Sequence, residues 1–336
     1  MRVLITGATG MIGRKLTDRL LETAALGGAP LAALDLVDIV APIDGGDATT
    51  GSRPAAHTDS EVNPAIEVNH IAADLSDRGT ATMLAEREAD VVFHLAGVVS
   101  GEAEADLAKG YRVNLDGTRL LFDALAAAPS VPRVVFTSSI AVFGAPFPEV
   151  IGDDFHLTPL TSYGTQKAMG EALLADYSRR GLIDGIGLRL PTITVRPGRP
   201  NAAASGFFSS IIREPLAGEQ AILPVPRSVR HIHASPRSAV GYLLHAAELD
   251  TARLGPRRNL TMPSVSVTVA EQIEALARVA GPDAVDHIVE RADPVVAAII
   301  AGWPRRFATE RADVLGFIGE ATYDEIIRTY IEDDLH

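Results

Sequence analysis

Short runs of apolar residues, many of them β-branched, alternate with longer stretches of helical pattern through the first two thirds of the chain. Apolar runs of about four to eight residues are typical of strands that are buried on both faces. The runs with this pattern are RVLITG, LAALDLVDIV, IEVNHIAA, ADVVFHLAG, PRVVFTSS and GIGLRLPTI. Strands that alternate with helices predict an α/β fold with a parallel, doubly wound sheet.

Several stretches between these strands have helical patterns and predict helices over residues 11–25, 104–128 and 161–180. Residues 41–64 differ, because they are rich in Gly, Pro, Ser, Thr and Asp. They are predicted to form a long surface loop between the second and third strands.

The regular alternation is lost after residue 195. Beyond it, the sequence predicts a short helix over 207–218, small strands within 221–234 and a clear helix over 235–249 that begins at a serine cap. We expect the chain to leave the sheet, return to it once and leave again. The predicted division is a sheet domain of residues 1–195 with about 228–250, and a smaller C-terminal lobe of about 196–227 with 251–336.

The composition narrows the class of protein. Hydrophobic residues make up 47% of the 336 residues, which is ample for a buried core. The formal net charge of -13 and the absence of a long Lys/Arg run argue against nucleic acid or an anionic membrane as the main partner. The chain has no cysteine, which excludes disulfides, a thiol nucleophile and thiolate metal ligands. No stretch of about eighteen apolar residues is present, and we expect a soluble, cytoplasmic protein.

A glycine-rich turn follows the first predicted strand. Gly7, Gly10 and Gly13 stand three residues apart in GATGMIG, at the start of the first predicted helix. Glycine at these places lets the backbone turn tightly, approach a pyrophosphate and pack the helix on the sheet, while the helix N-terminus favours negative charge. Because an acidic residue, Asp38, lies near the end of the second strand, the pattern predicts dinucleotide binding.

The acidic residue also indicates which dinucleotide is bound. A carboxylate such as that of Asp38 bonds the free ribose hydroxyls of NAD and repels the extra phosphate of NADP, so NAD is the predicted cofactor. Arg14 and Lys15, just past the third glycine, could instead meet that phosphate, although such charges more often face solvent. Asp35 lies earlier in the same strand and is expected to have a structural role.

Two further pairs of residues lie where functional groups are expected. Asp74 and Leu75 follow the third strand and would reach the adenine edge, although Asp74 could equally cap the next helix. Tyr163 and Lys167 are four residues apart at the start of a predicted helix, and so lie on one face of it. This second pair is either a catalytic couple or a packed aromatic ring beside a solvated lysine.

The order of these motifs resembles that of the extended short-chain dehydrogenase/reductase family. The sequences HLAGVVS and TSSIAVFG follow the fourth and fifth strands, and Tyr163 and Lys167 come after them. The resemblance covers nearly the whole chain and implies a Rossmann NAD(P) domain with a C-terminal substrate lobe. It also implies that Ser139 is catalytic, with Ser138 as the runner-up. Tyr163 would be the proton donor and acceptor and Lys167 its helper, and Asn114 would steady the site.

Elementary electrostatics supports these roles. A free tyrosine titrates near pH ~10, and lowering its pKa by ~3 units requires roughly 4 kcal/mol. One ammonium at ~4 Å with an effective dielectric of ~20 supplies about that much. Lys167 is therefore expected to bring Tyr163 into working range, while Ser139 holds the substrate oxygen and a hydride passes to the nicotinamide. No metal is needed, and His231 and His233, alternate residues of a predicted strand, are not expected to bind one.

The tail of the chain indicates the class of substrate. Residues 302–333, with GATGMIGRKL and LVDIVAP, resemble family members that oxidise the 2-hydroxyl of a small sugar acid with NAD. The carboxylate of such an acid needs a cation, and arginine is suited to bidentate binding. The arginines in lobe-forming stretches, which the sequence does not rank, are Arg199, Arg230, Arg306 and Arg311.

Motifs and resemblance together assign the binding residues. The residues expected at the cofactor are Gly7, Gly10, Met11, Ile12, Gly13, Asp38, Asp74, Leu75, Ala96, Gly97, Val98, Tyr163, Lys167 and Pro191. Those expected at the substrate are Ser139, Tyr163, Thr192, Arg199, Arg230 and Arg306. Ser205, Gly206 and Phe207 open a segment that borders the substrate in the family. Trp303 either walls the pocket or anchors the tail, and core packing is the expected role.

Two other functions remain open from the sequence. A nucleotide-sugar epimerase of the same family would use the same Ser139, Tyr163 and Lys167, but it would produce no net NADH. A non-catalytic NAD-binding regulator would not need that set of side chains. Relatives often pair through helices corresponding to 104–128 and 161–180, so a homodimer is a further hypothesis.

Overall fold

The structure is a computed structural model that describes residues 1–40, 66–198 and 204–335. The loop predicted over 41–64 and the candidate Arg199 lie outside the described residues. The strands are β1 (Arg2–Thr6), β2 (Ala25–Leu26), β3 (Ala29–Pro30), β4 (Ala33–Asp38), β5 (Glu67–Ala72), β6 (Val91–His94), β7 (Arg133–Ser139), β8 (Asp184–Leu190), β9 (Thr192–Ile193), β10 (Ala221–Leu223), β11 (Arg230–Ala234), β12 (Asn259–Thr261), β13 (Val265–Thr268) and β14 (Ile288–Glu290). The α-helices are α1 (Met11–Thr23), α2 (Arg78–Ala85), α3 (Ser100–Ala105), α4 (Leu107–Gly110), α5 (Thr118–Ala127), α6 (Ser162–Arg179), α7 (Gly206–Leu216), α8 (Pro236–Glu248), α9 (Val269–Ala280), α10 (Pro282–Val285), α11 (Pro294–Ala301), α12 (Glu310–Val314) and α13 (Tyr323–Asp333). Turns of other helical types are the π-helical η1 (Tyr111–Gly117) and the 3₁₀ turns η2 (Ile140–Val142) and η3 (Thr251–Leu254).

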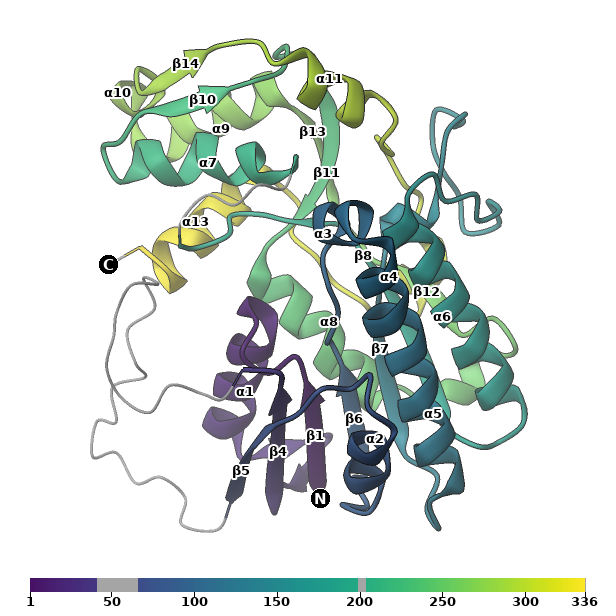
Figure 1. The fold of residues 1–336 in the computed structure, drawn as a ribbon. Coiled ribbons are helices and arrows are strands. Elements are labelled where there is room, and N and C mark those ends of the chain that lie inside the picture. The colour runs from purple at the N-terminus through teal and green to yellow at the C-terminus, as the bar shows by residue number, and fades with distance from the viewer. Residues whose placement is uncertain (41–65, 199–203, 336) are drawn as a thin grey trace.

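A seven-stranded parallel sheet forms the centre of the molecule, in the order β12-β8-β7-β6-β1-β4-β5 (Figure 1). The six strands expected from the apolar runs are all in it, as β1, β4, β5, β6, β7 and β8, so the predicted doubly wound sheet is confirmed. The helices predicted over 11–25, 161–180 and 235–249 are confirmed as α1, α6 and α8. Because all strands run the same way, their carboxyl ends meet at one edge, where loops can gather functional groups.

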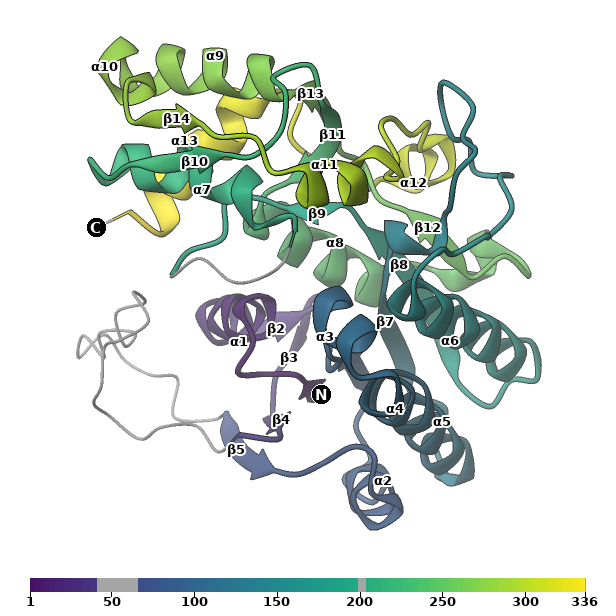
Figure 2. The ribbon, with the colours of Figure 1, turned by 45° about the horizontal axis from the view of Figure 1, so that its top comes forward.

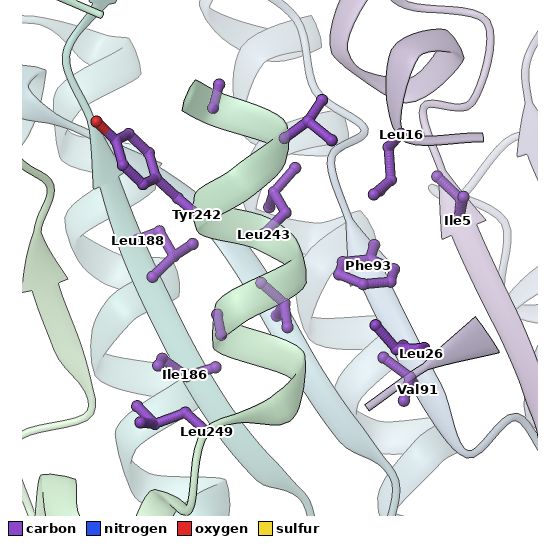
Figure 3. Packing of buried hydrophobic residues seen from close by; sticks show 14 of the residues in the cluster. Ile5, Leu16, Leu26, Val91, Phe93, Ile186, Leu188, Tyr242, Leu243 and Leu249 are labelled. Carbon is purple, nitrogen blue, oxygen red and sulfur yellow. The ribbon is translucent and has the colours of Figure 1, made fainter. Parts of the chain in front are cut away.

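Helices cover both faces of this sheet (Figure 2). On one face lie α1 and α8, where Leu16 and Leu243 belong to the same buried cluster as Ile5 (Figure 3). On the other face lie α2, α5 and α6, and there Leu4 belongs to a second cluster with Leu121. Successive strand residues therefore bury their side chains on opposite faces, which explains the continuous apolar runs. In the described part of the chain, no helix is long and apolar enough to cross a membrane.

A smaller lobe lies beyond the carboxyl edge of the sheet (Figure 1). It combines α7, α9, α10 and α13 with the small sheets β10-β14 and β13-β11-β9. Phe208, Ile273 and Ile327 lie in its own buried cluster. The predicted division needs one correction, because β12 pairs with β8 in the main sheet although residues 251–336 were assigned to the lobe. Three residues, Asn-Leu-Thr, are too short a run for periodicity to reveal.

The helix predicted over 104–128 is not continuous. The chain forms α3, α4, η1 and α5 in succession, with a break at Asp106. The Asp106 carboxylate accepts a hydrogen bond from the Lys109 amide at 2.9 Å and so caps α4. The π-helical turn η1 carries Asn114, which is 1% exposed. Such turns occur often at functional sites, and apolar spacing alone does not distinguish them from an α-helix.

The last predicted strand, GIGLRLPTI, is divided at Pro191. β8 ends at Leu190 and pairs with β7, whereas β9 begins at Thr192 and pairs with β11 of the small sheet. Proline has no N–H group to donate, so it ends the first ladder. Thr192 is thereby held at the carboxyl edge, between the main sheet and the lobe.

Candidate active site

The glycine-rich turn forms one side of the carboxyl edge. Gly7 has a φ of +76°, and a Cβ there would lie 2.8 Å from the backbone nitrogen of Ala96. A Cβ on Gly13 would lie 2.2 Å from the Gly7 carbonyl oxygen, whereas a Cβ on Gly10 would lie 3.3 Å from it. Among the described residues, no side chain caps the N-terminus of α1. The turn therefore needs two glycines for its own shape, and it leaves helix N–H groups for an anion such as a pyrophosphate.

Asp38 lies at the end of β4 beside this turn. Its carboxylate accepts hydrogen bonds from the backbone N–H of Thr9 at 3.0 Å and from the Thr9 hydroxyl at 2.7 Å. Asp35, the competing acid, is fully buried and forms ion pairs with Arg2 and Arg87 at 3.1 and 2.5 Å. Asp35 thus has the structural role expected of it, and the half-buried Asp38 fits the ribose of NAD.

One of the two neighbouring basic residues is already paired, and the other is exposed. The Lys15 ammonium pairs with the Asp334 carboxylate at 2.7 Å and ties α1 to the end of α13. Arg14 is exposed. Met11 and Ile12 are partly buried and pack on the core cluster beneath α1. Their backbone, rather than their side chains, is therefore what the turn offers to a cofactor.

Asp74 shapes the turn after β5 without capping α2. Its carboxylate accepts hydrogen bonds from the amide and the hydroxyl of Ser76, which lower the pKa of Asp74. The cap of α2 is Asp77, which accepts from the Thr80 amide at 2.9 Å. Leu75 is 7% exposed and belongs to the core cluster, so only its backbone is free to meet an adenine.

Asn114 holds the loop that follows β6. Its Oδ1 accepts from the Val98 amide at 2.8 Å, and its Nδ2 donates to the Val98 carbonyl at 3.1 Å and to Gln166 Oε1 at 2.8 Å. A Cβ on Gly97 would lie 2.9 Å from Asn114 Oδ1. The buried Gln166 was not predicted, although its place beside Lys167 was a signal. Asn114 therefore joins the 96–98 loop to α6.

The two serines at the end of β7 have different surroundings. The Ser138 hydroxyl donates to Glu171 at 2.6 Å, and Glu171 forms a buried ion pair with Arg189 at 2.7 Å. Ser139 is the last residue of β7, and its Oγ accepts only from the Ala141 amide, at 3.1 Å, among the described residues. The hydroxyl of Ser139 is not committed to the buried Glu171 and Arg189 pair and lies where it influences Tyr163, which favours Ser139 over Ser138.

Tyr163 and Lys167 occupy the first turns of α6. Thr161 caps this helix by accepting from the Gly164 amide at 3.0 Å. The Lys167 ammonium is buried, donates to the Thr137 carbonyl at 2.8 Å and lies 5.8 Å from the centroid of the Tyr163 ring. Tyr163 and Lys167 therefore lie on the same face of α6, as predicted. The lysine is anchored to β7 next to the tyrosine.

The expected effect of Lys167 on Tyr163 needs a correction. Burial raises the pKa of Tyr163 above its ordinary value, and the hydroxyl of Ser139 and the charge of Arg196 only partly oppose this rise. Burial also lowers the pKa of Lys167 to about 8, against the opposing charge of Glu171. Desolvation thus outweighs the charges, and the tyrosine is protonated at neutral pH.

The described arginines among those predicted to bind the substrate have other contacts. Arg230 pairs with Glu271 at 3.1 Å, and the Arg311 guanidinium donates to main-chain carbonyls, that of Arg257 at 2.8 Å among them. Arg230 and the exposed Arg306 line a groove of about 1520 Å³ on the lobe. Within the described structure, this groove is not lined by the serine, tyrosine and lysine of the carboxyl edge. The structure therefore does not bring these arginines to the site.

Arg196 is a site residue that the sequence reasoning missed. Its Nε donates to the Ile193 carbonyl at 3.0 Å, and its main chain is held by Ser209 and Arg213 of α7. Burial lowers the pKa of Arg196, and Tyr163 opposes that change. Its position five residues after Pro191, in the sequence TVRPG, is the feature from which a role at the site could have been predicted.

The remaining lobe candidates are mostly packing residues. Phe207, at the start of α7, is 8% exposed and belongs to the lobe core. Trp303 packs against the lobe core, with its ring 5.2 Å from that of His231, and it also lines the groove on the lobe, so both roles considered for it are present. His231 and His233 are fully buried and contact threonine hydroxyls, of Thr192 at 2.7 Å and of Thr194 at 3.1 Å. In the described ranges, no group of three acidic or histidine residues could hold a metal.

The carboxyl edge thus fits NAD and presents a serine, a tyrosine and a lysine beside it, which defines an NAD-dependent oxidoreductase. Comparison with known proteins gives the family. The chain belongs to the NAD dependent epimerase/dehydratase family, whose model matches residues 3–230.

Relatives match this chain from end to end. A D-erythronate dehydrogenase of Cupriavidus necator is 47% identical over 99% of this chain and 98% of its own. Another, of Haemophilus influenzae, is 38% identical and matches over 100% of both chains. A crystal structure described as the nucleoside-diphosphate-sugar epimerase of Agrobacterium tumefaciens is 55% identical, with a TM-score of 0.92 over 100% of this chain and 94% of its own. The predicted family and fold are confirmed.

Proposed function

We propose that this protein oxidises the 2-hydroxyl of D-erythronate with NAD and forms 2-oxo-D-erythronate. The observation that carries the proposal is the full-length similarity to two D-erythronate dehydrogenases in a chain that keeps Ser139, Tyr163 and Lys167 at one edge of the sheet. The similarity includes the tail, 302–333, from which the sugar-acid class was predicted.

The proposed mechanism is a proton transfer to Tyr163 coupled to loss of a hydride. When bound, NAD supplies the acceptor for the hydride of the C2–H bond. Ser139 donates a hydrogen bond to the substrate oxygen, and the phenolate of Tyr163 removes the proton of the 2-hydroxyl. Lys167, held by Thr137, stabilises that phenolate, and Asn114 holds the 96–98 loop beside them.

The rate of oxidation is expected to rise with pH. Only deprotonated Tyr163 can accept the proton, and burial raises the pKa of this tyrosine, so the active form grows as the pH rises. We expect kcat/KM for the acid to increase from about pH 6 to about pH 8, by up to about tenfold per unit. Lys167, with its pKa lowered to about 8, loses its charge above that, so the increase should level off. Initial NADH rates in buffers of constant ionic strength measure the profile, and a rate that falls with pH contradicts the assignment.

The direct test of the function is absorbance at the NADH band. Purified protein is incubated with NAD and a panel of aldonic acids of about four to six carbons, with D-erythronate and L-threonate among them. We expect NADH with D-erythronate and the largest kcat/KM for that acid. The absence of NADH with every acid of the panel would falsify the proposal.

A nucleotide-sugar epimerase is the second candidate. It is favoured by the description of the Agrobacterium tumefaciens structure, which is 55% identical to this chain. The same three side chains would serve both reactions, but an epimerase regenerates its NAD in each cycle. Conversion of UDP-glucose to UDP-galactose without net NADH, together with silence on the acids, would favour the epimerase. The homodimer expected from the family stays a prediction.

A further inference from the structure

Thr192 is the accessible end of a buried polar network. Its hydroxyl lies 2.7 Å from Nε2 of His231, whose Nδ1 lies 3.1 Å from the carbonyl oxygen of Pro304. His231 is fully buried, between the rings of Phe208 and Trp303 at 5.1 and 5.2 Å. Thr192 keeps partial exposure. Its hydroxyl therefore contacts His231, while the residue as a whole remains partly accessible.

The partners fix the direction of each hydrogen bond. The Pro304 carbonyl can only accept, so Nδ1 of His231 carries the proton. The opposite tautomer would leave two lone pairs facing each other at 3.1 Å. Burial lowers the pKa of His231 to about 4, so the ring is neutral near pH 7 and its Nε2 has a free lone pair. The Thr192 hydroxyl must donate to that lone pair, and its oxygen can then only accept from a ligand.

Thr192 stands at the catalytic edge of the sheet. Leu190, two residues earlier, is the register partner of Ser139 in the neighbouring strand. After Pro191 the chain turns into β9, whose pairing with β11 brings Thr192 against the histidine. Thr192 thus lies two residues beyond the register partner of Ser139, close in the fold to the proposed reacting groups.

We propose that His231 is a positioning residue that makes the Thr192 hydroxyl a hydrogen-bond acceptor for the bound reactants. Thr192 would then bind a donor, either an O–H of the polyol acid or an N–H of the nicotinamide amide, and would not bind the carboxylate. For the acid, this inference rests on the proposed function. It makes the further hydroxyls of the substrate a basis of specificity, because an acid without them leaves the acceptor unpaired.

Two variants of His231 form a matched pair. Asparagine places its amide near the position of Nδ1, so His231→Asn keeps the bond to Pro304 and loses the acceptor for Thr192. Glutamine reaches the position of Nε2, so His231→Gln keeps an acceptor for Thr192 and loses the bond to Pro304. Both remove the aromatic ring, so their structural costs are similar. We expect His231→Asn to raise the Michaelis constant of the reactant that donates to Thr192, the acid or the cofactor, about fivefold, which corresponds to one neutral hydrogen bond. In His231→Gln the same constant should stay within about twofold of wild type.

A double-mutant cycle with Thr192→Val tests whether His231 acts through the threonine. Thr192→Val is expected to match His231→Asn, and the double variant to be no worse than either. A rise in KM for D-erythronate, but not for 2-hydroxybutyrate of the same C2 configuration, identifies a substrate hydroxyl as the donor. A loss of NADH affinity, measured by fluorescence without turnover, identifies the nicotinamide amide instead.

The inference and the proposed function can fail separately. If wild-type protein oxidises D-erythronate but the cycle is additive, or if His231→Gln behaves like His231→Asn, the histidine is only structural and the inference is wrong. If no acid is oxidised, the proposed function fails. In that case the inference is tested by NADH affinity alone. If wild type, His231→Asn and Thr192→Val bind NADH equally well, the inference is wrong.

Discussion

Tyr163→Phe is expected to lower kcat for NAD reduction by about 10³-fold, because it removes the group that accepts the substrate proton. Phenylalanine keeps the ring at the start of α6, where the centroid of the Tyr163 ring lies 5.8 Å from the Lys167 ammonium, so the fold should not change. NADH binding should therefore stay within about twofold of wild type. The two quantities are measured by steady-state absorbance with the best acid of the panel and by NADH fluorescence.

The same helix offers a matched control. The Tyr177 hydroxyl, also on α6, donates to the Asp123 carboxylate and is remote from the carboxyl edge. Tyr177→Phe loses a hydrogen bond without touching the site, so its activity should remain within about twofold of wild type. A Tyr163→Phe protein as active as this control would remove the tyrosine from the mechanism. It would also revive the hypothesis of a regulator that binds NAD without using the catalytic set.

Local pattern was enough to predict the central sheet. Each strand of a doubly wound sheet is buried on both faces, so Val3, Leu4 and Ile5 are all apolar, and the run is short and flanked by glycine. The glycine turn was equally clear, because Gly7 has a φ of +76° and a Cβ on Gly13 would meet the Gly7 carbonyl oxygen. These two requirements lie within the turn, although a Cβ on Gly7 would also meet the distant Ala96 backbone.

Features that depend on partners distant in sequence were not predicted. Asn259 to Thr261 form an edge strand only because Gly187 to Arg189 of β8 lie beside them. The apolar pattern also runs through Pro191, although the chain changes sheets there. Nothing within a window of about ten residues distinguishes such a strand from a loop, since its stability comes from the pairing.

Long charged side chains were the weakest part of the site prediction. Arg230 was a candidate for the carboxylate, but Glu271 of α9 pairs with it at 3.1 Å. Arg196, which was not considered, is the arginine whose charge reaches Tyr163. The pKa argument had the same weakness, because it counted the charge of Lys167 and could not count the burial that opposes it.

Asp38→Asn is expected to reduce kcat/KM for NAD by about 10- to 100-fold. The ratio of kcat/KM for NADP to kcat/KM for NAD should therefore rise. The carboxylate of Asp38 lies at the end of β4, where two charge-assisted hydrogen bonds to ribose hydroxyls would be lost. Asparagine retains one oxygen that can accept from the amide and hydroxyl of Thr9, but its NH2 group cannot accept from the Ile39 amide, which bonds the other carboxylate oxygen at 2.7 Å. A second variant is therefore needed to separate the loss of charge from a displaced turn.

Thr9→Val separates these two effects. It removes the hydroxyl that donates to Asp38 at 2.7 Å but leaves the carboxylate and the Thr9 amide bond at 3.0 Å. If the negative charge selects NAD, Thr9→Val should change KM for NAD by less than about threefold and leave the ratio of NAD to NADP activity as in wild type. If anchoring of the turn is what matters, Thr9→Val and Asp38→Asn should weaken both cofactors alike. Steady-state rates with each cofactor at a saturating acid concentration decide between them, and an unchanged ratio in Asp38→Asn would remove this carboxylate as the basis of NAD preference.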